Sequence, residues 1–188
     1  MRVIAGSARG RKLRSVEDHG IRPTTDRLKE SLFSTLGPGI KGKRVLDLYA
    51  GSGGLGIEAL SRGAEAATFV ESSASAASMI EANLASTGLD DRADVVRQKA
   101  ERFAGGSRFG GRRPYDVVLA DPPYDEGIPR AVLEKLSQSG QLAAGAMVVV
   151  EVSSRLENLE PPVGYRLLDV RRYGDSKLLY LKPEEGDE

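Results

Sequence analysis

Short apolar runs alternate with amphipathic segments through the middle of the chain. Runs typical of buried strands occupy residues 44–49, 66–71, 93–98, 115–121 and 146–152. Segments with the 3.6-residue period of helices lie between them, at residues 55–62, 73–87 and 127–138. Strands that alternate with helices in this way are typical of a parallel sheet that is covered on both faces. The pattern therefore predicts an α/β fold.

The two ends of the chain follow other patterns. Residues 2–16 alternate loosely around a glycine-rich break, which predicts a small basic β-hairpin. Residues 22–39 predict a helix that Thr24 or Thr25 can cap and that a Gly-Pro-Gly run ends. Residues 165–182 predict two antiparallel strands joined by a tight turn. We therefore expect three parts: an N-terminal extension (1–40), a core (41–183) and an acidic tail (184–188).

The 188 residues include no cysteine and one histidine, His19. The lack of cysteine excludes disulfides, thiolate metal sites and cysteine nucleophiles. A single histidine disfavours a Ser-His triad and a histidine-rich metal site, so we expect no metal. No apolar run approaches the roughly 20 residues that span a bilayer, and the first residues are not typical of a signal peptide. We therefore expect a cytoplasmic protein with no membrane partner.

Charge is spread unevenly along a chain whose formal net charge is zero. Residues 1–29 contain eight basic and three acidic side chains. Four of the basic side chains lie close together: Arg9, Arg11, Lys12 and Arg14. This cluster favours a polyanionic partner such as a nucleic acid, because phosphate contacts give affinity that does not depend on base sequence. The alternative is a solvated segment without a partner.

A glycine-rich loop separates the first core strand from the helix that follows it. After Ala50 the loop reads Gly51-Ser52-Gly53-Gly54-Leu55-Gly56. Glycines let a ligand approach the backbone, and the helix N-terminus offers N–H donors. Glu71 ends the next strand, where a carboxylate can accept hydrogen bonds from ribose hydroxyls. Loop and acid together predict a cofactor that contains a nucleoside. The alternative is a plain turn, with Glu71 capping the next helix.

Two classes of cofactor use this arrangement. The G-x-G-x-x-G spacing is typical of dinucleotides. Asp47, four residues before Gly51, argues against a dinucleotide, because a pyrophosphate would be repelled by a second carboxylate. S-adenosylmethionine offers a ribose to Glu71, an α-amino group to Asp47 and no phosphate. A dinucleotide enzyme usually also has a second mononucleotide-binding half, for which this chain has no candidate. The sequence therefore favours S-adenosylmethionine.

The segment Asp121-Pro122-Pro123-Tyr124 directly follows an apolar run. In open α/β sheets, ligands bind beyond the carboxyl ends of the strands. An exocyclic amine of a base is a poor nucleophile, because its lone pair is delocalised into the ring. Asp121 and the Pro122 carbonyl can each accept one of its N–H bonds and so hold the lone pair toward a methyl donor. Tyr124 can stack on a flipped base. The segment predicts a clamp for an amine, and the alternative is an ordinary strand-end turn.

Three segments together resemble a known family: RPTTDRLKESLF, LDLYAGSGGLGIEALSRGA and DPPY. In this order and spacing they resemble the bacterial 16S ribosomal RNA guanine-N2 methyltransferases along essentially the whole chain. The resemblance implies a Rossmann-like class I methyltransferase fold. Its seven-stranded, mostly parallel sheet ends in an antiparallel hairpin, and a small hairpin and helix precede it. It also implies S-adenosylmethionine as donor, and as target one guanine of 16S RNA within an assembling small subunit.

The resemblance assigns roles by position. It places the donor against Thr24, Asp47, Ala50, Gly51, Ser52, Gly53, Glu71 and Ala100. It places the target base against Asp121, Pro122 and Tyr124. The helix that begins near Thr24 closes over the methionine end of the donor. Near the adenine, many such enzymes have an acidic or amide residue where this chain has Lys99.

Other functions remain open at this point. A DNA amino-methyltransferase is the nearest alternative, because the clamp also suits adenine N6 and cytosine N4. Such an enzyme must read a duplex, whereas only about 40 N-terminal residues lie outside the core. An RNA-binding module without catalysis is an alternative from another class. We expect the protein to be a monomer.

Overall fold

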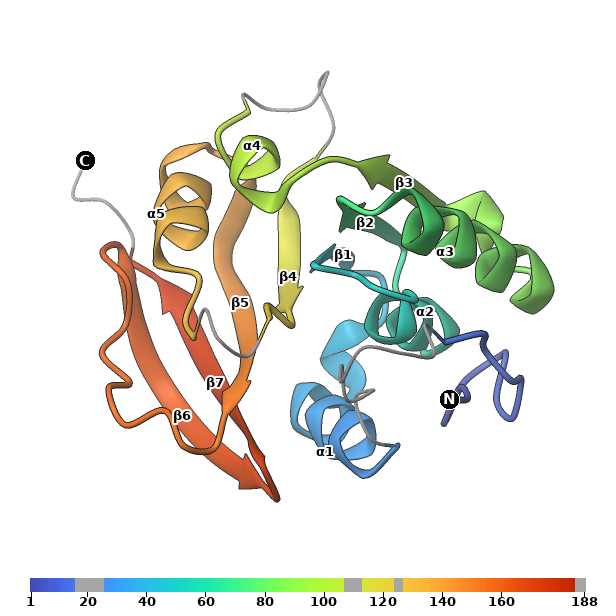
Figure 1. The fold of residues 1–188 in the computed structure, drawn as a ribbon, viewed down its shortest axis with the longest axis horizontal. Coiled ribbons are helices and arrows are strands. Elements are labelled where there is room, and N and C mark those ends of the chain that lie inside the picture. Colours follow the sequence, from blue (N-terminus) through green and yellow to red (C-terminus); the bar gives the residue numbers. More distant parts are fainter. Residues whose placement is uncertain (16–25, 107–112, 124–126, 185–188) are drawn as a thin grey trace.

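Seven strands form one sheet in the part of the chain that the computed structural model describes, residues 1–15, 26–106, 113–123 and 127–184 (Figure 1). The strands are β1 (Arg44–Leu48), β2 (Ala66–Glu71), β3 (Ala93–Arg97), β4 (Tyr115–Ala120), β5 (Leu142–Ser153), β6 (Tyr165–Tyr173) and β7 (Ser176–Pro183). Their order across the sheet is β3-β2-β1-β4-β5-β7-β6. The first five strands are parallel, and β7 pairs antiparallel with both β5 and β6. The predicted mostly parallel sheet with an antiparallel end is confirmed.

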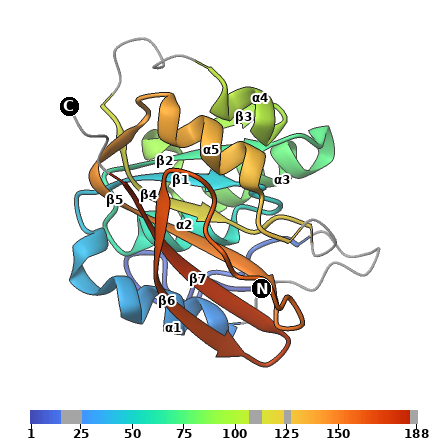
Figure 2. The same cartoon turned by 90° about the vertical axis from the view of Figure 1, so that its left-hand side faces the viewer.

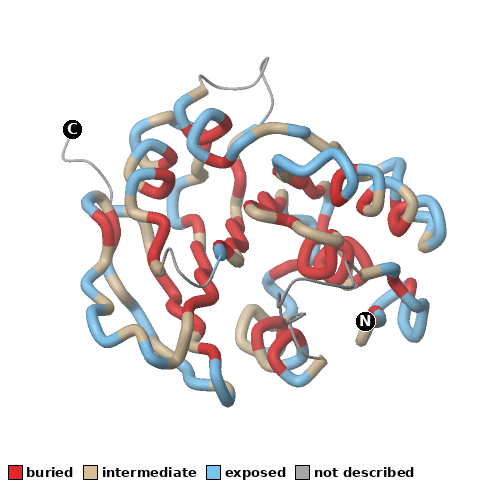
Figure 3. The backbone as a smooth tube through the Cα atoms, in the orientation of Figure 1, coloured by how far each residue is buried: buried red, intermediate tan, exposed pale blue. Residues whose placement is uncertain are grey.

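Helices cover both faces of the sheet. They are α1 (Asp26–Leu36), α2 (Gly54–Ser61), α3 (Ala74–Thr87), α4 (Ala100–Ala104) and α5 (Arg130–Gln138), with short 3-10 turns η1 (Gly37–Ile40) and η2 (Asp90–Arg92). One apolar cluster joins the sheet to α1, α2 and α3, and a second joins it to α4 and α5. Figure 2 shows the hairpin of β6 and β7 at the outer edge of the sheet. The central strands are buried along most of their length, as Figure 3 shows.

Residues of β1 alternate between the two apolar clusters. Val45 belongs to the cluster with α1, α2 and α3, whereas Leu46 and Leu48 belong to the cluster with α4 and α5. Asp47 lies on the same side as Val45, because successive side chains of a strand point to opposite faces. The one carboxylate of this strand therefore points toward α2.

Three details differ from the sequence-based expectation. Strand β5 begins at Leu142, four residues before the predicted run at 146–152. Helix α4 was not predicted, because its five residues are too few to show a helical period. The N-terminal hairpin is closed by one antiparallel bridge, between Arg2 and Lys12, and not by two full strands.

Strand register brings the candidate residues to one edge of the sheet. Leu48 of β1 pairs with Val70 of β2 and with Ala120 of β4. Glu71 and Asp121 each follow directly after those partners, so they flank the glycine loop that leaves β1. This is the arrangement that the sequence predicted for a ligand beyond the carboxyl ends of the strands.

Candidate functional site

The glycine loop turns sharply between β1 and α2. Three residues between these two elements have a positive φ: Tyr49 (58°) before the loop, and Gly51 (56°) and Gly53 (80°) within it. Tyr49 is the one non-glycine residue with a positive φ among the described residues. Such a conformation is costly for a tyrosine, and strain of this kind is concentrated at functional sites. Nothing in the sequence distinguished Tyr49, since tyrosine is an ordinary residue at the end of a strand.

Two carboxylates hold the loop in place. Glu71 accepts a hydrogen bond from the Gly51 N–H at 2.9 Å and, through its other oxygen, one from the Ser73 N–H at 2.8 Å. Asp47 accepts a hydrogen bond from the Gly56 N–H at 2.8 Å. Both acids that the sequence assigned to a cofactor therefore also fix the backbone of the glycine loop and its flanks.

Asp47 is 1% exposed and has other carboxylates nearby. Burial raises the pKa of its carboxyl group well above the ordinary value of 3.8, and the Gly56 N–H lowers it in part. The charges of Asp121 and Glu71 raise this pKa further. Asp121 and Glu71 thus both add negative charge near the buried Asp47, and a cation that binds nearby lowers this repulsion. The electrostatics favour a cationic ligand over a pyrophosphate.

Close packing explains why a glycine, Gly56, stands in the first turn of α2. A Cβ on Gly56 would lie 2.3 Å from the Phe69 ring and 3.0 Å from the Asp47 carboxylate. A side chain at this position would displace the Phe69 ring, so glycine allows α2 to lie this close to β1 and β2. The same close approach allows the hydrogen bond between Gly56 and Asp47.

Asp121 and Pro122 lie beside the loop. The Asp121 N–H donates to the Leu48 carbonyl at 3.4 Å, which continues the pairing of β4 with β1 past the last strand residue. Asp121 is half-buried and Pro122 is buried. The structure therefore brings Asp121 together with Asp47 and Glu71. Thr24 and Tyr124, two other predicted site residues, lie outside the described residues.

Ala100 lies at the same edge of the sheet. It is buried at the start of α4, directly after Lys99. The Gln98 N–H donates to the Glu71 carbonyl at 3.0 Å, which joins the segment after β3 to the strand that carries the candidate ribose acid. Ala50 is also buried, and its carbonyl accepts the Gly53 N–H at 2.7 Å within the loop.

The N-terminal segment, residues 1–15, is docked on the core beside α2 and α3 and is called the arm below (Figure 1). Its inward side chains recur at every fifth position and are buried: Val3, Ala8 and Leu13. Its predicted RNA-binding side chains are all exposed: Arg9, Arg11, Lys12 and Arg14. The arm thus places an apolar side on the core and a basic side toward solvent.

Buried polar groups hold the start of the arm. Glu58 of α2, fully buried, accepts the N–H groups of Ile4 at 2.8 Å and Ala5 at 3.0 Å and pairs with Arg62 at 2.7 Å. Lys29 of α1, also fully buried, donates to the Arg2 carbonyl at 2.5 Å. Burial lowers the pKa of the Lys29 amine, and the nearby carboxylates of Glu58 and Asp26 raise it in part. Sequence reasoning missed both buried residues, although a glutamate inside the apolar run of α2 was a usable signal.

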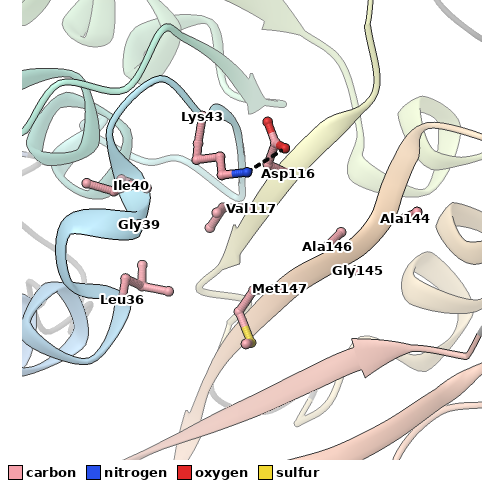
Figure 4. A pocket seen from close by; sticks show the side chains of 10 residues that line it. All are labelled: Leu36, Gly39, Ile40, Lys43, Asp116, Val117, Ala144, Gly145, Ala146 and Met147. Atoms are coloured by element: carbon pink, nitrogen blue, oxygen red, sulfur yellow. Dashed lines mark hydrogen bonds and ion pairs between the residues drawn. The ribbon is translucent and has the colours of Figure 1, made fainter.

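A cavity of about 170 Å³ lies at the opposite end of the sheet (Figure 4). Residues of η1 and the early parts of β4 and β5 line it, and Lys43 points across it to Asp116 at 3.2 Å. Asp116 also accepts the Arg44 N–H at 2.9 Å, so it fixes the amino end of β1. The cavity is therefore separate from the glycine loop, which lies at the carboxyl end.

The described ranges contain neither a metal-binding cluster nor a membrane-spanning helix. Within residues 1–15, 26–106, 113–123 and 127–184, no group of three histidine or acidic side chains is placed to hold a metal ion. In the same ranges no helix is long and apolar enough to cross a bilayer.

This chain is similar to one protein family and to proteins that are named as rRNA methyltransferases. The family model described as "Conserved hypothetical protein 95" matches residues 1–182. YlbH of Bacillus subtilis, named as a candidate rRNA methyltransferase, is 43% identical over 84% of this chain and 85% of its own length. Ribosomal RNA small subunit methyltransferase D of Escherichia coli K12 is 39% identical over 87% of this chain and 79% of its own.

A solved structure extends the likeness to the fold. The Escherichia coli protein YhhF, described as a candidate methyltransferase, covers 98% of both chains with a TM-score of 0.83 and 35% identity. The seven-stranded sheet with its antiparallel end is the fold of class I methyltransferases, and the predicted fold class is confirmed.

Proposed function

The chain belongs to the conserved hypothetical protein 95 family, and from this and its site we propose that it methylates the exocyclic N2 amine of a guanine in 16S ribosomal RNA. The donor in this proposal is S-adenosylmethionine. Two relatives support the substrate class, because their names describe rRNA methyltransferases. We further propose that the protein acts as a cytoplasmic monomer on an assembling small subunit.

The observation that carries the proposal is the group of three carboxylates around a glycine loop. Asp47, Glu71 and Asp121 interact electrostatically at the carboxyl edge of the sheet. This negative site fits a cofactor with a sulfonium and an ammonium group and does not fit a pyrophosphate. When bound, S-adenosylmethionine supplies the methyl group as an electrophile.

The residues present fit that cofactor. Glu71 stands at the end of β2 and faces the loop, where it can accept hydrogen bonds from ribose hydroxyls. Gly51 and Gly53 have no side chain to block approach to the backbone. Ala100 lies just after β3, next to this position, and in this proposal it contacts the adenine of the donor. Asp47 is buried beneath the loop. Its carboxylate therefore acts on the donor's amine mainly by Coulomb attraction.

Asp121 and Pro122 orient the target amine in this proposal. Their carboxylate and carbonyl oxygens each accept one N–H of the guanine N2 group, which directs the nitrogen lone pair toward the donor. Positioning and electrostatics then supply most of the catalysis. Tyr124 supports the flipped base by stacking.

The arm binds the RNA in this proposal. Four exposed cations on one docked segment can contact phosphates without ordering a flexible chain. Because the arm is anchored to α2, its charges stand at a fixed distance from the glycine loop. A rigid basic surface suits an RNA whose shape is already folded.

Single-turnover methylation of small-subunit particles from a strain that lacks the enzyme tests the proposal. We expect one N2-methylguanine per particle, identified by mass spectrometry of digested 16S RNA. Methylation of duplex DNA at adenine N6 or cytosine N4, with no product on the particles, would instead identify a DNA amino-methyltransferase. Particle binding with no donor affinity would identify a binding module.

A further inference from the structure

One amide side chain connects the arm to the glycine loop. Asn83 of α3 is 1% exposed and uses both ends of its amide. Its oxygen accepts the Arg14 N–H at 2.8 Å, and its nitrogen donates to the Arg14 carbonyl at 2.9 Å. The same nitrogen donates to the Ser52 carbonyl at 2.9 Å. Arg14 lies at the end of the arm, and Ser52 lies inside the loop.

This contact fixes an orientation that the loop needs. When the Ser52 carbonyl points to Asn83, the N–H of the same peptide unit points the other way, and it donates to the Ala50 carbonyl at 2.7 Å. Gly51 and Gly53 on either side have positive φ and little intrinsic preference for one conformation. The hydrogen bond from Asn83 to Ser52, the residue between these two glycines, therefore selects one loop shape from several.

The other end of the arm also reaches the loop. A Cβ on Gly54, the first residue of α2, would lie 2.7 Å from the Met1 sulfur. The N–H groups of Ile4 and Ala5 bind Glu58, one turn along the same helix. The arm thus touches the loop through Asn83 and the helix that follows the loop through Met1 and Glu58.

We propose that the docked arm is a working part of the cofactor site, and that Asn83 is the positioning residue through which it acts. This rests on the function proposed above. A loop that is already ordered binds its ligand more tightly, because less conformational freedom is lost on binding. Cofactor affinity then depends on whether the end of the arm is docked.

A double-mutant cycle on S-adenosylhomocysteine binding, measured by calorimetry, tests the proposal. Asn83→Ala removes the link, and Leu13→Ala loosens the buried anchor next to Arg14. We expect each single variant to weaken binding about three- to tenfold, the effect of one lost hydrogen bond. The double variant should be no weaker than Asn83→Ala alone, because both changes interrupt one path.

Thr87→Val is the matched control on the same helix. Among the residues that the structure describes, the Thr87 hydroxyl donates to two backbone carbonyls of α3, at 2.8 Å to Asn83 and 2.9 Å to Leu84. This variant should lower the melting temperature and keep wild-type affinity. In turnover assays Asn83→Ala should raise KM for the donor and leave kcat near wild type at saturation.

Two results would overturn the proposal. One is wild-type affinity in folded Asn83→Ala, or in Leu13→Ala should Asn83→Ala not fold. The other is strict additivity in the double variant, which means that arm and loop act independently. Absence of S-adenosylhomocysteine binding in the wild-type protein would contradict the proposed function itself, so the two failures are distinguishable.

Discussion

The buried carboxylate of Asp47 accepts a hydrogen bond from the backbone N–H of Gly56 at 2.8 Å. Asp47 therefore joins β1 to the first turn of α2, at the cost of burying a charge. An asparagine at this position can still accept the same hydrogen bond through its amide oxygen and carries no charge. Asp47→Asn should therefore raise the stability of the free protein and weaken donor binding.

We expect Asp47→Asn to stabilise the free protein in a pH-dependent way. Burial raises the pKa of Asp47 in the folded state above 3.8, so ionisation costs stability as pH rises through and above that value. The gain in unfolding free energy from Asn should be absent below about pH 3.8, grow as the pH rises above that value, and level off once Asp47 is ionised in the folded protein. Thermal unfolding between about pH 3.5 and 8 measures it. Equal unfolding free energies at all pH values would contradict the prediction.

Glu71→Ala should weaken donor binding by about 1.5–3 kcal/mol, the typical contribution of a charge-assisted hydrogen bond. Glu71 also holds the Gly51 N–H, so loss of loop order is a second possible cause. Calorimetry with S-adenosylhomocysteine and with its 2′-deoxyribose analogue separates the two. If Glu71 binds the ribose, the deoxy compound should be much less affected by the substitution than the parent compound.

Asp121→Ala should reduce kcat of methyl transfer by at least about a hundredfold and leave most of the donor affinity in place. The carboxylate acts on the incoming amine. Its removal should therefore raise mainly the free energy of the transition state, which lowers kcat. Asp116→Ala is the matched control, because Asp116 lies near the start of β4, whereas Asp121 directly follows the other end of this strand. Near-normal turnover in Asp121→Ala would show that the proposed clamp is not used.

Charge reversal of the arm should weaken RNA binding without disturbing the core. Arg9→Glu with Arg11→Glu changes two exposed side chains and no buried anchor. We expect lower affinity for small-subunit particles and a salt dependence reduced by about two counterions. Arg166→Glu on the distant strand β6 is the control, with little expected change. Deletion of the whole arm is a poorer test, since it also exposes the buried carboxylate of Glu58.

Sequence reasoning located the core of this fold well, because strands buried on both faces leave uninterrupted apolar runs. The run at 115–121 corresponds to β4 within one residue. The early part of β5 was missed because Leu142–Gly145 includes exposed small residues that interrupt the apolar pattern. Helix α4 has a single turn and gives no periodic signal.

The candidate site was predicted in part. Order along the chain placed Asp47, Glu71 and Asp121 at neighbouring strand ends, because parallel strands share a carboxyl edge. The roles of Asn83 and Glu58 could not be predicted in the same way. Their backbone partners lie 31 to 69 residues away, and backbone groups leave no trace in a residue pattern.

The strand order has a consequence for synthesis of the chain. Strand β7 lies between β5 and β6, although it leaves the ribosome after the other six described strands. Until residue 183 has emerged, β5 has an open edge and β6 has no neighbour to pair with. The long edge of β5 is then available for pairing with other chains, a known route to aggregation during folding. Premature termination before β7 therefore removes an interior strand and leaves two unpaired edges in the nascent chain.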